Sequence, residues 1–202
     1  MKTICYIGGS PCSGKSTVAQ ALAERYGLTL FKVDDHLDAL IDRGAAAGWP
    51  VCSRIRRMTA EETWMRDPQA QCREELDFYA EVAPLVSELL EQVDAERIVA
   101  EGAAFLPVTV RGWGVPPQRY VAITPTREFQ WSRYAERPWV PHVLRDCSDC
   151  QAAFANWMAR DALFAEEVRR QCGRLGYLSL LTDGSVPEDA RLREVARHFH
   201  LE

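Results

Sequence analysis

The chain of 202 residues is long enough to bury the core of one domain. Its apolar fraction of 47% and charged fraction of 26% are those of a globular protein and exclude a disordered one. The net charge is −5, from 24 basic and 29 acidic residues, which does not favour a general nucleic-acid or membrane-surface binder. The sequence has no apolar run of membrane-spanning length and no secretion signal before its first glycine loop, so we expect a cytoplasmic protein.

Strands and helices are expected to alternate along the chain. The strands are predicted at residues 3–7, 29–33, 97–100, 120–123 and 177–181. The helices are predicted at residues 15–26, 36–43, 67–92 with a kink at Pro84, 126–136 and 151–172. Two patterns with the spacing of a capping box, at residues 59–62 and 185–188, are expected to begin further helices, and residues 44–58 and 138–149 are expected to be irregular. This alternation predicts an α/β domain with a parallel sheet.

The first predicted strand runs into a complete phosphate-binding pattern. The segment Gly9-Ser10-Pro11-Cys12-Ser13-Gly14-Lys15-Ser16 matches G-x-x-x-x-G-K-[ST] and precedes a predicted helix. Its glycines let the backbone curl so that N–H groups point at phosphate oxygens, and the helix N-terminus adds an anion site. We expect Lys15 to reach the β- and γ-phosphates, Ser16 to place its hydroxyl on Mg²⁺, and Thr17 to complete the nucleotide site. The pattern therefore predicts ATP and Mg²⁺ as cofactors.

With this loop and this order of elements, the chain resembles the nucleoside-monophosphate-kinase-like group of P-loop proteins. That group includes adenylate, shikimate, gluconate and uridine kinases and chloramphenicol phosphotransferase. The resemblance implies a P-loop NTPase three-layer sandwich: a five-stranded parallel sheet in the order 2-3-1-4-5, helices on both faces and a helical lid. It also implies one kinase domain over residues 1–202, with an acceptor-binding segment at about 36–92 and a lid at about 133–152. The guanine-reading motif of Ras-like GTPases and the signature of ABC ATPases are absent from the sequence.

The sequence Val33-Asp34-Asp35 ends the second predicted strand, at the sheet edge where parallel sheets build their sites. The resemblance implies that an Asp at this place contacts the acceptor hydroxyl. A carboxylate there can orient the hydroxyl and take its proton, so Asp34 is the candidate catalytic base and Asp35 a further substrate-binding candidate. The alternative interpretation is that either residue caps the helix predicted at 36–43.

Further candidates follow the third strand and the second helix. The resemblance implies that Glu101 holds Mg²⁺ through water or binds the acceptor, and that Gly102 lets the substrate approach closely. A simple turn at the end of the strand is the alternative for both. Arg54 and Arg57 would suit a phosphate-bearing acceptor, but a solvated basic loop explains them equally well.

Arg133 and Arg137 stand four residues apart, which places both on one face of their predicted helix. In adenylate-kinase-like enzymes such a pair lies at the lid hinge, where one arginine covers adenine and the other meets the transferring phosphate. An exposed pair on a surface helix is the alternative. The turn Asp183-Gly184 follows the fifth strand, and the resemblance implies that its backbone touches the adenine edge.

The seven cysteines are odd in number and do not suggest a disulfide framework. Cys147-x-x-Cys150 near His142 raises a zinc site, but a second ligand pair is missing from the sequence, so we expect no zinc. The function expected is an ATP-dependent kinase that transfers the γ-phosphoryl group to a hydroxyl of a small molecule. We expect a monomer or homodimer without nucleic-acid or membrane partners. A nucleotide kinase with a phosphate acceptor, and a nucleotide-binding regulator without transferase activity, remain alternatives.

Overall fold

The computed structural model describes residues 2–202 and contains a five-stranded sheet whose neighbouring strands are all parallel. Its strands are β1 (Thr3–Gly9), β2 (Thr29–Lys32), β3 (Arg97–Glu101), β4 (Tyr120–Pro125) and β5 (Leu178–Thr182). Their order in the sheet is β2-β3-β1-β4-β5. The fold class predicted from the sequence is therefore confirmed.

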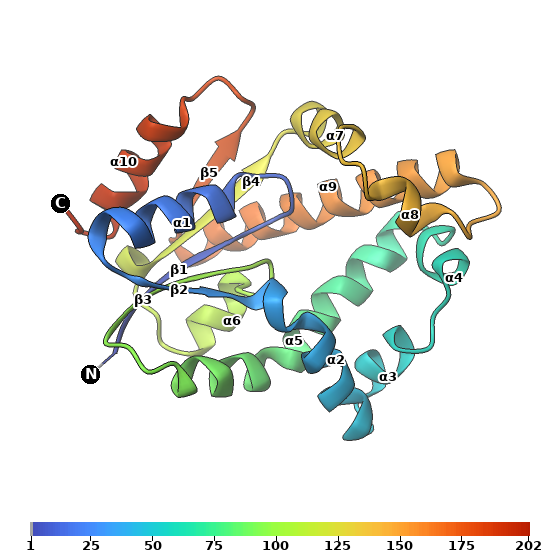
Figure 1. Cartoon of the computed structure of the whole chain (residues 1–202), viewed down its shortest axis with the longest axis horizontal. Helices are drawn as coiled ribbons and strands as arrows, with labels where there is room; N and C mark the ends of the chain where they lie inside the picture. The colour runs from blue at the N-terminus through green and yellow to red at the C-terminus, as the bar shows by residue number, and fades with distance from the viewer. Residues whose placement is uncertain (1) are drawn as a thin grey trace.

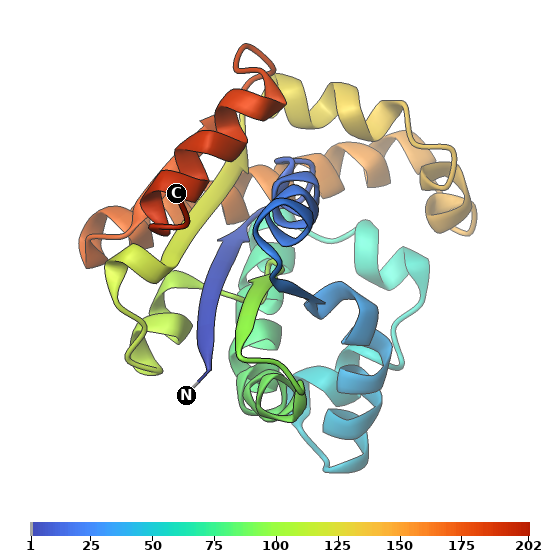
Figure 2. The same ribbon diagram turned by 60° about the vertical axis from the view of Figure 1, so that its left-hand side comes forward.

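Helices cover both faces of this sheet (Figures 1 and 2). One face carries α1 (Lys15–Tyr26) and α10 (Glu188–His198), which share a buried apolar cluster with β1, β4 and β5. The other face carries α5 (Pro68–Gln92), α6 (Pro107–Gly112) and α9 (Cys150–Leu175) over a larger apolar cluster. Helix α5 changes direction along its length in both views and contains Pro84, as expected of a proline kink. None of the helices within residues 2–202 is long and apolar enough to cross a membrane.

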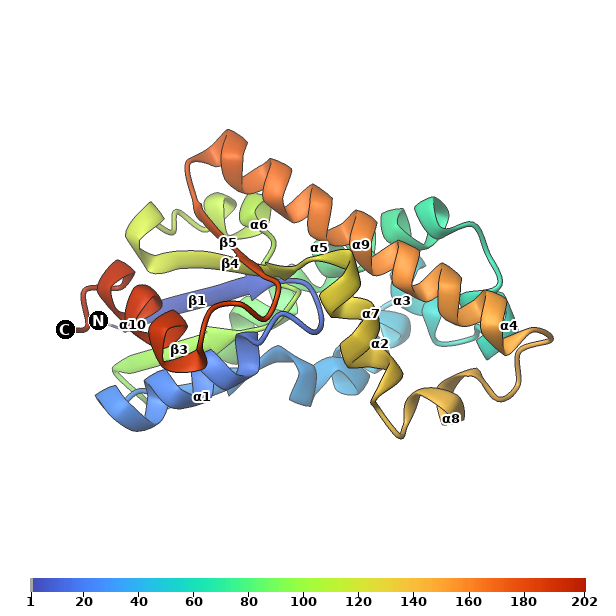
Figure 3. The same cartoon turned by 90° about the horizontal axis from the view of Figure 1, so that it is seen from above.

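The remaining helices lie beyond the carboxyl ends of the strands. The 3₁₀ turn η1 (Val33–His36) and helices α2 (Leu37–Ala46), α3 (Pro50–Ile55) and α4 (Ala60–Trp64) connect β2 to α5. On the other side of this end, α7 (Arg127–Ala135) and α8 (Val140–Leu144) connect β4 to α9. The short 3₁₀ turn η2 (Pro117–Arg119) lies instead at the amino end of β4. Figure 3 shows α7 and α8 running beside the N-terminal half of α9. The two groups of helices therefore flank the end of the sheet at which the phosphate loop lies.

Several short helices were not predicted from the sequence. Residues 44–58 were expected to be irregular, but they contain the end of α2 and all of α3. Helix α3 forms because Glu81 of α5 accepts hydrogen bonds from the backbone N–H groups of Val51 at 3.0 Å and Cys52 at 2.7 Å. Residues 138–149 were also expected to be irregular, and α8 forms there because Val140 and Leu144 are buried. Helix α6 lies in a segment for which no element was predicted.

The predicted helix starts have mixed outcomes. The capping box at Thr59 is present, with Glu62 as its partner, and Asp67 caps α5 by accepting a hydrogen bond from Ala70 N at 3.0 Å. The second capping box is wrong. The Ser185 N–H and hydroxyl both donate to Asp183 Oδ1, at 2.9 and 2.6 Å, and α10 begins at Glu188 without a side-chain cap. Ser185 therefore closes a tight turn and does not begin a helix.

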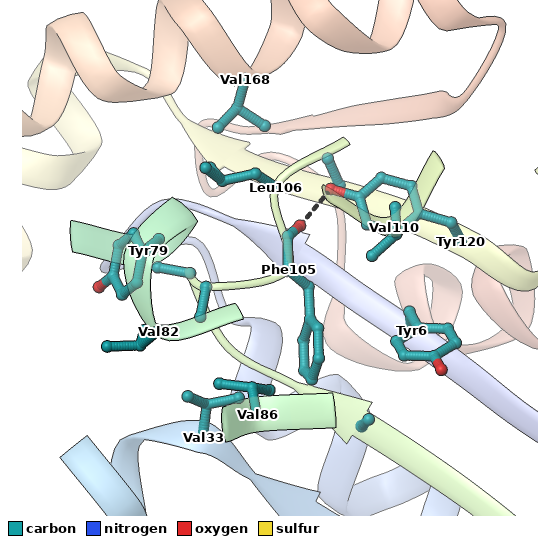
Figure 4. Close-up of a cluster of buried hydrophobic side chains, with 14 of the residues drawn as sticks. Tyr6, Val33, Tyr79, Val82, Val86, Phe105, Leu106, Val110, Tyr120 and Val168 are labelled. Carbon is teal, nitrogen blue, oxygen red and sulfur yellow. Dashed lines mark hydrogen bonds between the residues drawn. The ribbon is translucent and has the colours of Figure 1, made fainter. Parts of the chain in front are cut away.

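Strand β1 leads into the phosphate loop and packs against a buried aromatic cluster. The rings of Tyr6 and Phe105 pack edge-on with centroids 5.3 Å apart, and the Tyr120 hydroxyl donates to the Phe105 carbonyl oxygen at 2.8 Å (Figure 4). A Cβ atom at Gly8 would lie 2.2 Å from that hydroxyl oxygen, so the cluster leaves room for nothing larger than glycine there. The start of the loop is thus held in place by tight packing.

We expect Tyr120→Phe to lower the free energy of unfolding by about 1–3 kcal/mol, because the buried Phe105 carbonyl would lose its hydrogen-bond donor. Urea unfolding followed by circular dichroism measures this change. Tyr26→Phe, at a partly exposed tyrosine, is the matched control and should alter stability by less than about 0.5 kcal/mol. Equal losses in the two variants would contradict the role given to the Tyr120 hydroxyl.

Candidate active site

Three residues of the phosphate loop have a positive φ, a backbone conformation that favours glycine. Gly9 has a φ of 123°, and a Cβ atom there would lie 1.9 Å from the Ile123 carbonyl oxygen. Cys12 and Gly14 are left-handed, with φ of 59° and 83°, and Gly14 precedes α1 without a side-chain cap. The first-turn N–H groups of α1 are therefore not capped by a side chain, which leaves them available to an anion.

Side chains of the loop also present unpaired polar atoms. The Lys15 side chain is buried and its Nζ donates to the Ser10 carbonyl oxygen at 3.0 Å, leaving other protons for a ligand. The hydroxyl oxygens of Ser10 and Ser13 are buried without a hydrogen-bond partner within residues 2–202. Thr182 of β5 fixes the loop by donating to the Ser13 carbonyl oxygen at 3.0 Å. Buried hydroxyl donors without partners fit the phosphate oxygens of a nucleotide, which accept hydrogen bonds.

Glu101 lies beside the phosphate loop at the end of β3. Its side chain is 1% exposed, and Oε2 has no hydrogen-bond partner in the described part of the chain. Burial raises the pKa of this carboxyl, while the Lys15 charge and a hydrogen bond with Ser16 oppose the rise and Asp34 adds to it. The structure thus brings Lys15, Ser16, Asp34 and Glu101 together. An unpaired carboxylate oxygen next to a serine hydroxyl is a donor set that fits Mg²⁺.

Gly102 has a structural reason that the sequence did not reveal. Its φ is 156°, and a Cβ atom there would lie 2.8 Å from the Val33 Cβ atom. The close approach of the ends of β3 and β2 therefore requires glycine at this position, whether or not a substrate also passes nearby.

Asp34 and Asp35 both lie in η1, directly after β2, and both are exposed. Neither η1 nor α2 has a side-chain cap, since their N-cap positions are Lys32 and His36. The structure thus gives neither carboxylate the capping role that the sequence left open. The charge of Asp34 acts on Glu101 and on Tyr79 of α5, which places it on the inner side of the strand end.

Arg133 lies on α7, whereas Arg137, expected on the same helix, lies after its end at Ala135. The Arg133 guanidinium lies 5.0 Å from the centre of the Phe129 ring, and the Arg137 guanidinium lies 5.0 Å from the Tyr134 ring. Burial raises the pKa of the Cys12 thiol, whereas the positive charges of Arg137, Lys15 and Arg133 lower it. Both lid arginines therefore act on the tip of the phosphate loop.

A cavity of about 230 Å³ lies beside the phosphate loop. It lies between the start of α1, the α7 residues Phe129 and Arg133, and the turn after β5 that contains Gly184. Thr17 and Gly14 also line it. Asp183 does not line this cavity, because its carboxylate accepts two hydrogen bonds from Ser185. The cavity is where a group attached to loop-bound phosphates would extend.

The arginines of the acceptor segment are placed differently from the lid arginines. Arg54 Nε forms an ion pair with Glu74 Oε1, and Arg66 pairs with the other oxygen of the same carboxylate. Arg57 is exposed, and its Nε donates to the Ser53 carbonyl oxygen at 2.9 Å. Arg54 is thus neutralised by a carboxylate, and Arg57 is bonded to the backbone of its own helix.

The cysteines of the lid segment form contacts of their own. Among residues 2–202, no group of three or more His, Cys, Asp or Glu side chains is placed to share a metal ion. The Cys150 sulfur lies 3.1 Å from the Leu144 carbonyl oxygen.

Sequence analysis missed a buried polar network on α5 and α9. Arg160 lies 2.6 Å from Asp161 Oδ1 through its Nε and 2.5 Å from Glu75 Oε2 through its other guanidinium nitrogen. Asp161 is 1% exposed, and its Oδ2 has no hydrogen-bond partner in the described chain. Burial raises the pKa of Asp161 to about 6, against the opposing charges of Arg160 and Lys15. Asp161 is therefore a second buried carboxylate beside the phosphate loop.

A signal for this network was present in the sequence. Positions 157, 161, 164 and 168 lie on one face of the helix predicted at 151–172, and all four are buried. A charged residue within such an apolar face indicates a paired or functional group.

We expect Asp161→Asn to raise the free energy of unfolding at pH 8 relative to the wild type. The folded-state pKa of about 6 exceeds the ordinary value of 3.8, so the folded state binds the proton more tightly than the unfolded state. This carboxyl consequently costs stability as the pH rises from about 4 through 6, and the amide removes that cost. Urea unfolding at pH 4 and pH 8 measures the difference, with exposed Asp146→Asn as the control. A loss of stability at pH 8 in Asp161→Asn would show that Arg160 requires the ionised partner.

No protein-family model matches the chain, and no curated protein sequence matches it significantly. Solved structures match it over nearly its whole length. TT1252 from Thermus thermophilus is 21% identical with a TM-score of 0.50, covering 100% of this chain and 98% of that one. Shikimate kinase from Aquifex aeolicus is 17% identical with a TM-score of 0.49, covering 98% and 96%. A gluconokinase from Sinorhizobium meliloti is 14% identical with a TM-score of 0.48, covering 98% and 91%. Identities this low bear on the fold alone, and the sheet order makes that fold the P-loop one.

Proposed function

We propose that this chain is an ATP-dependent, Mg²⁺-requiring kinase that transfers the γ-phosphoryl group to a hydroxyl of a small molecule. One observation supports this most strongly. Asp34 is exposed and does not cap a helix, and it lies on the same strand-end edge as Glu101 and the buried Lys15 of a complete phosphate loop. A carboxylate in that position can accept the proton of an acceptor hydroxyl that attacks the γ-phosphate.

Each group has a role in this proposal. The N–H groups and serine hydroxyls of residues 9–17 bind the phosphates, and Lys15 neutralises their charge. Ser16 and Glu101 would hold Mg²⁺, which supplies positive charge to the phosphate oxygens. Arg133 and Gly184 line the cavity beside the phosphate loop that would receive the base and ribose, with Asp183 next to Gly184 in the same turn, and Arg137 would meet the transferring group.

Asp34 performs the proton transfer in this scheme. Its carboxylate accepts a hydrogen bond from the acceptor hydroxyl and takes the proton as the acceptor oxygen bonds to the γ-phosphorus. The bond between that phosphorus and the bridging oxygen of ADP breaks in the same displacement. Asp35 and Gly102 border the acceptor, and the segments at about 36–92 and 133–152 serve as acceptor arm and lid.

The alternatives have weaker support. A phosphate acceptor would need arginines free to bind it, whereas Arg54 is paired with Glu74, and Arg57 is exposed with its Nε bonded to the Ser53 carbonyl oxygen of α3. A regulator without transferase activity would not require an exposed carboxylate at the strand end that caps no helix.

The test is ADP release from ATP and Mg²⁺ in the presence of nucleosides, sugars, other hydroxylated metabolites and nucleoside monophosphates. The proposal predicts stimulation above the acceptor-free background by a hydroxyl-bearing class. Stimulation by nucleoside monophosphates alone would favour the phosphate-acceptor alternative. ATP binding without stimulation by any compound would favour the regulator.

A further inference from the structure

A second cavity, of about 180 Å³, lies away from the nucleotide side of the phosphate loop. It is bounded by α3, α4, the first turns of α5 and the middle of α9, which Figure 1 shows converging beyond the end of the sheet. The side chains that give it its character are Met58, Trp64, Arg66, Glu74, Glu75 and Arg160. We call it the arm cavity.

The charges that line the arm cavity are already matched. Glu74 is buried, and its two carboxylate oxygens each pair with a different arginine, Arg54 and Arg66. Arg160 pairs with Glu75 on one side and Asp161 on the other. An anion that displaced Arg66 or Arg160 from its carboxylate would leave a buried carboxylate without that partner, and a cation that displaced the arginines from Glu74 would leave them unpaired; the Arg66 Nε, which has no partner in the described chain, remains as a donor for a neutral ligand. Both exchanges are strongly unfavourable in a buried site.

The remaining lining combines the apolar side chains of Ile55, Met58 and Trp64 with the polar side chains of Thr63 and Gln71. The Trp64 ring stacks on the Trp157 ring with centroids 4.3 Å apart, and the Arg160 guanidinium lies 5.3 Å from the centre of the Trp64 ring. A cavity of about 150 Å³ accommodates benzene, so the arm cavity admits a group the size of a six-membered ring. Its lining offers the apolar side chains of Ile55 and Met58 and the Trp64 ring to such a group, together with carboxylate oxygens that accept hydrogen bonds from hydroxyls and the partnerless Arg66 Nε that donates one.

Two lining residues of the arm cavity, Glu75 and Arg160, contact or act on groups that lie towards the proposed transfer site. Burial raises the pKa of Tyr79 well above its ordinary value, and the charges of Glu75 and Asp34 raise it further. Tyr79 is thus near enough to both Glu75 and Asp34 for their charges to act on it, and Figure 4 shows its hydroxyl directed away from the apolar cluster. On the α9 side, Asp161 links Arg160 to Lys15 in the same way.

We propose that the arm cavity binds the phosphoryl acceptor and selects an uncharged, hydroxyl-bearing molecule of about one ring. This inference rests on the proposed function and adds the charge of the substrate to it. It excludes nucleotides and sugar acids as acceptors, because the arm cavity has no unpaired positive charge to bind their phosphate or carboxylate groups.

The first experiment does not depend on turnover. The protein is loaded with Mg²⁺ and a non-hydrolysable ATP analogue, which fills the phosphate loop, and is titrated with inorganic phosphate by calorimetry. We expect Glu74→Gln, which releases Arg54 and Arg66, to bind phosphate at least about tenfold more tightly than the wild type. Glu75→Gln, which leaves Arg160 paired with Asp161 alone, is the second variant if Glu74→Gln does not fold. Unchanged phosphate binding in the folded variants would overturn the proposal. Tight binding by the wild type that is lost in Arg66→Gln would overturn it as well.

The second experiment uses matched acceptors of one ring, such as a hexose with its uronic acid. We expect the uncharged member of a pair to be phosphorylated at least about tenfold faster, and a preference for the charged member would overturn the proposal. If no member of any pair is phosphorylated although ATP binds, the proposed function fails. The phosphate titration then decides the charge of the arm cavity by itself.

Discussion

Lys15→Ala is expected to reduce phosphoryl transfer by about 10²–10³-fold or more while leaving the fold intact. The buried Lys15 ammonium lies among the phosphate loop, Glu101 and Asp161, and it donates to the Ser10 carbonyl oxygen at 3.0 Å. A cation held there in advance stabilises negative charge that moves onto the phosphate oxygens in the transition state, and removing one such donor commonly costs this much. Steady-state rates of ADP formation measure the effect.

Lys2→Ala is the matched control for this variant. Lys2 is exposed, and its Nζ donates to the carbonyl oxygens at the end of α5, at the opposite end of β1 from the phosphate loop. We expect unchanged rates in this variant and similar thermal unfolding in both. Full transfer activity in a folded Lys15→Ala protein would show that the phosphates of ATP bind elsewhere.

Asp34→Asn is expected to lower kcat by about 10²–10⁴-fold with little change in ATP affinity. The amide has nearly the shape of the carboxylate but cannot take the proton of the acceptor hydroxyl. Because Asp34 caps neither η1 nor α2, the substitution removes no cap and should leave the melting temperature unchanged. Rates at saturating acceptor, together with calorimetric titration of the ATP analogue, separate turnover from binding.

Asp38→Asn, on the first turn of α2 and exposed like Asp34, is the control and should leave kcat unchanged. An unaltered rate in Asp34→Asn would remove the catalytic base from the account. A large fall in ATP affinity with kcat preserved would instead assign Asp34 to the nucleotide site.

The sheet could be predicted from the sequence because its signals are local. Each strand is a short apolar run, the phosphate loop marks the turn from β1 to α1, and the resemblance supplied the strand order. Helices with their own caps, such as α4 with Thr59 and α5 with Asp67, were found for the same reason.

The missed helices depend on partners that are distant in sequence. The backbone N–H groups at the start of α3 are satisfied by Glu81, 30 residues away from Val51. In the turn after β5, Asp183 takes the hydrogen bonds of Ser185, so a pattern that fits a capping box closes a turn. The first outcome depends on a contact distant in sequence, and the second on competition between two local patterns for the same serine.

The candidate site also contains some residues that could be predicted from the sequence and others that could not. The phosphate loop, Asp34 and Glu101 were found because they directly follow strands, and the structure brings them to one edge of the sheet. Arg160 and Asp161 were missed because their role depends on which face of α9 meets α5 and the phosphate loop. The pairing of Arg54 with Glu74, which turns a basic segment into a charge-balanced cavity, likewise requires the tertiary structure.

The central claim is that the γ-phosphoryl group of ATP is transferred to a hydroxyl at this site, and ³¹P NMR of the reaction mixture tests it most directly. With ATP, Mg²⁺ and the acceptor that stimulates ADP release, we predict a new phosphomonoester resonance that grows with the resonances of ADP. The resonance should be absent with Lys15→Ala. A new phosphoanhydride resonance, or inorganic phosphate as the sole product beside ADP, would contradict the account.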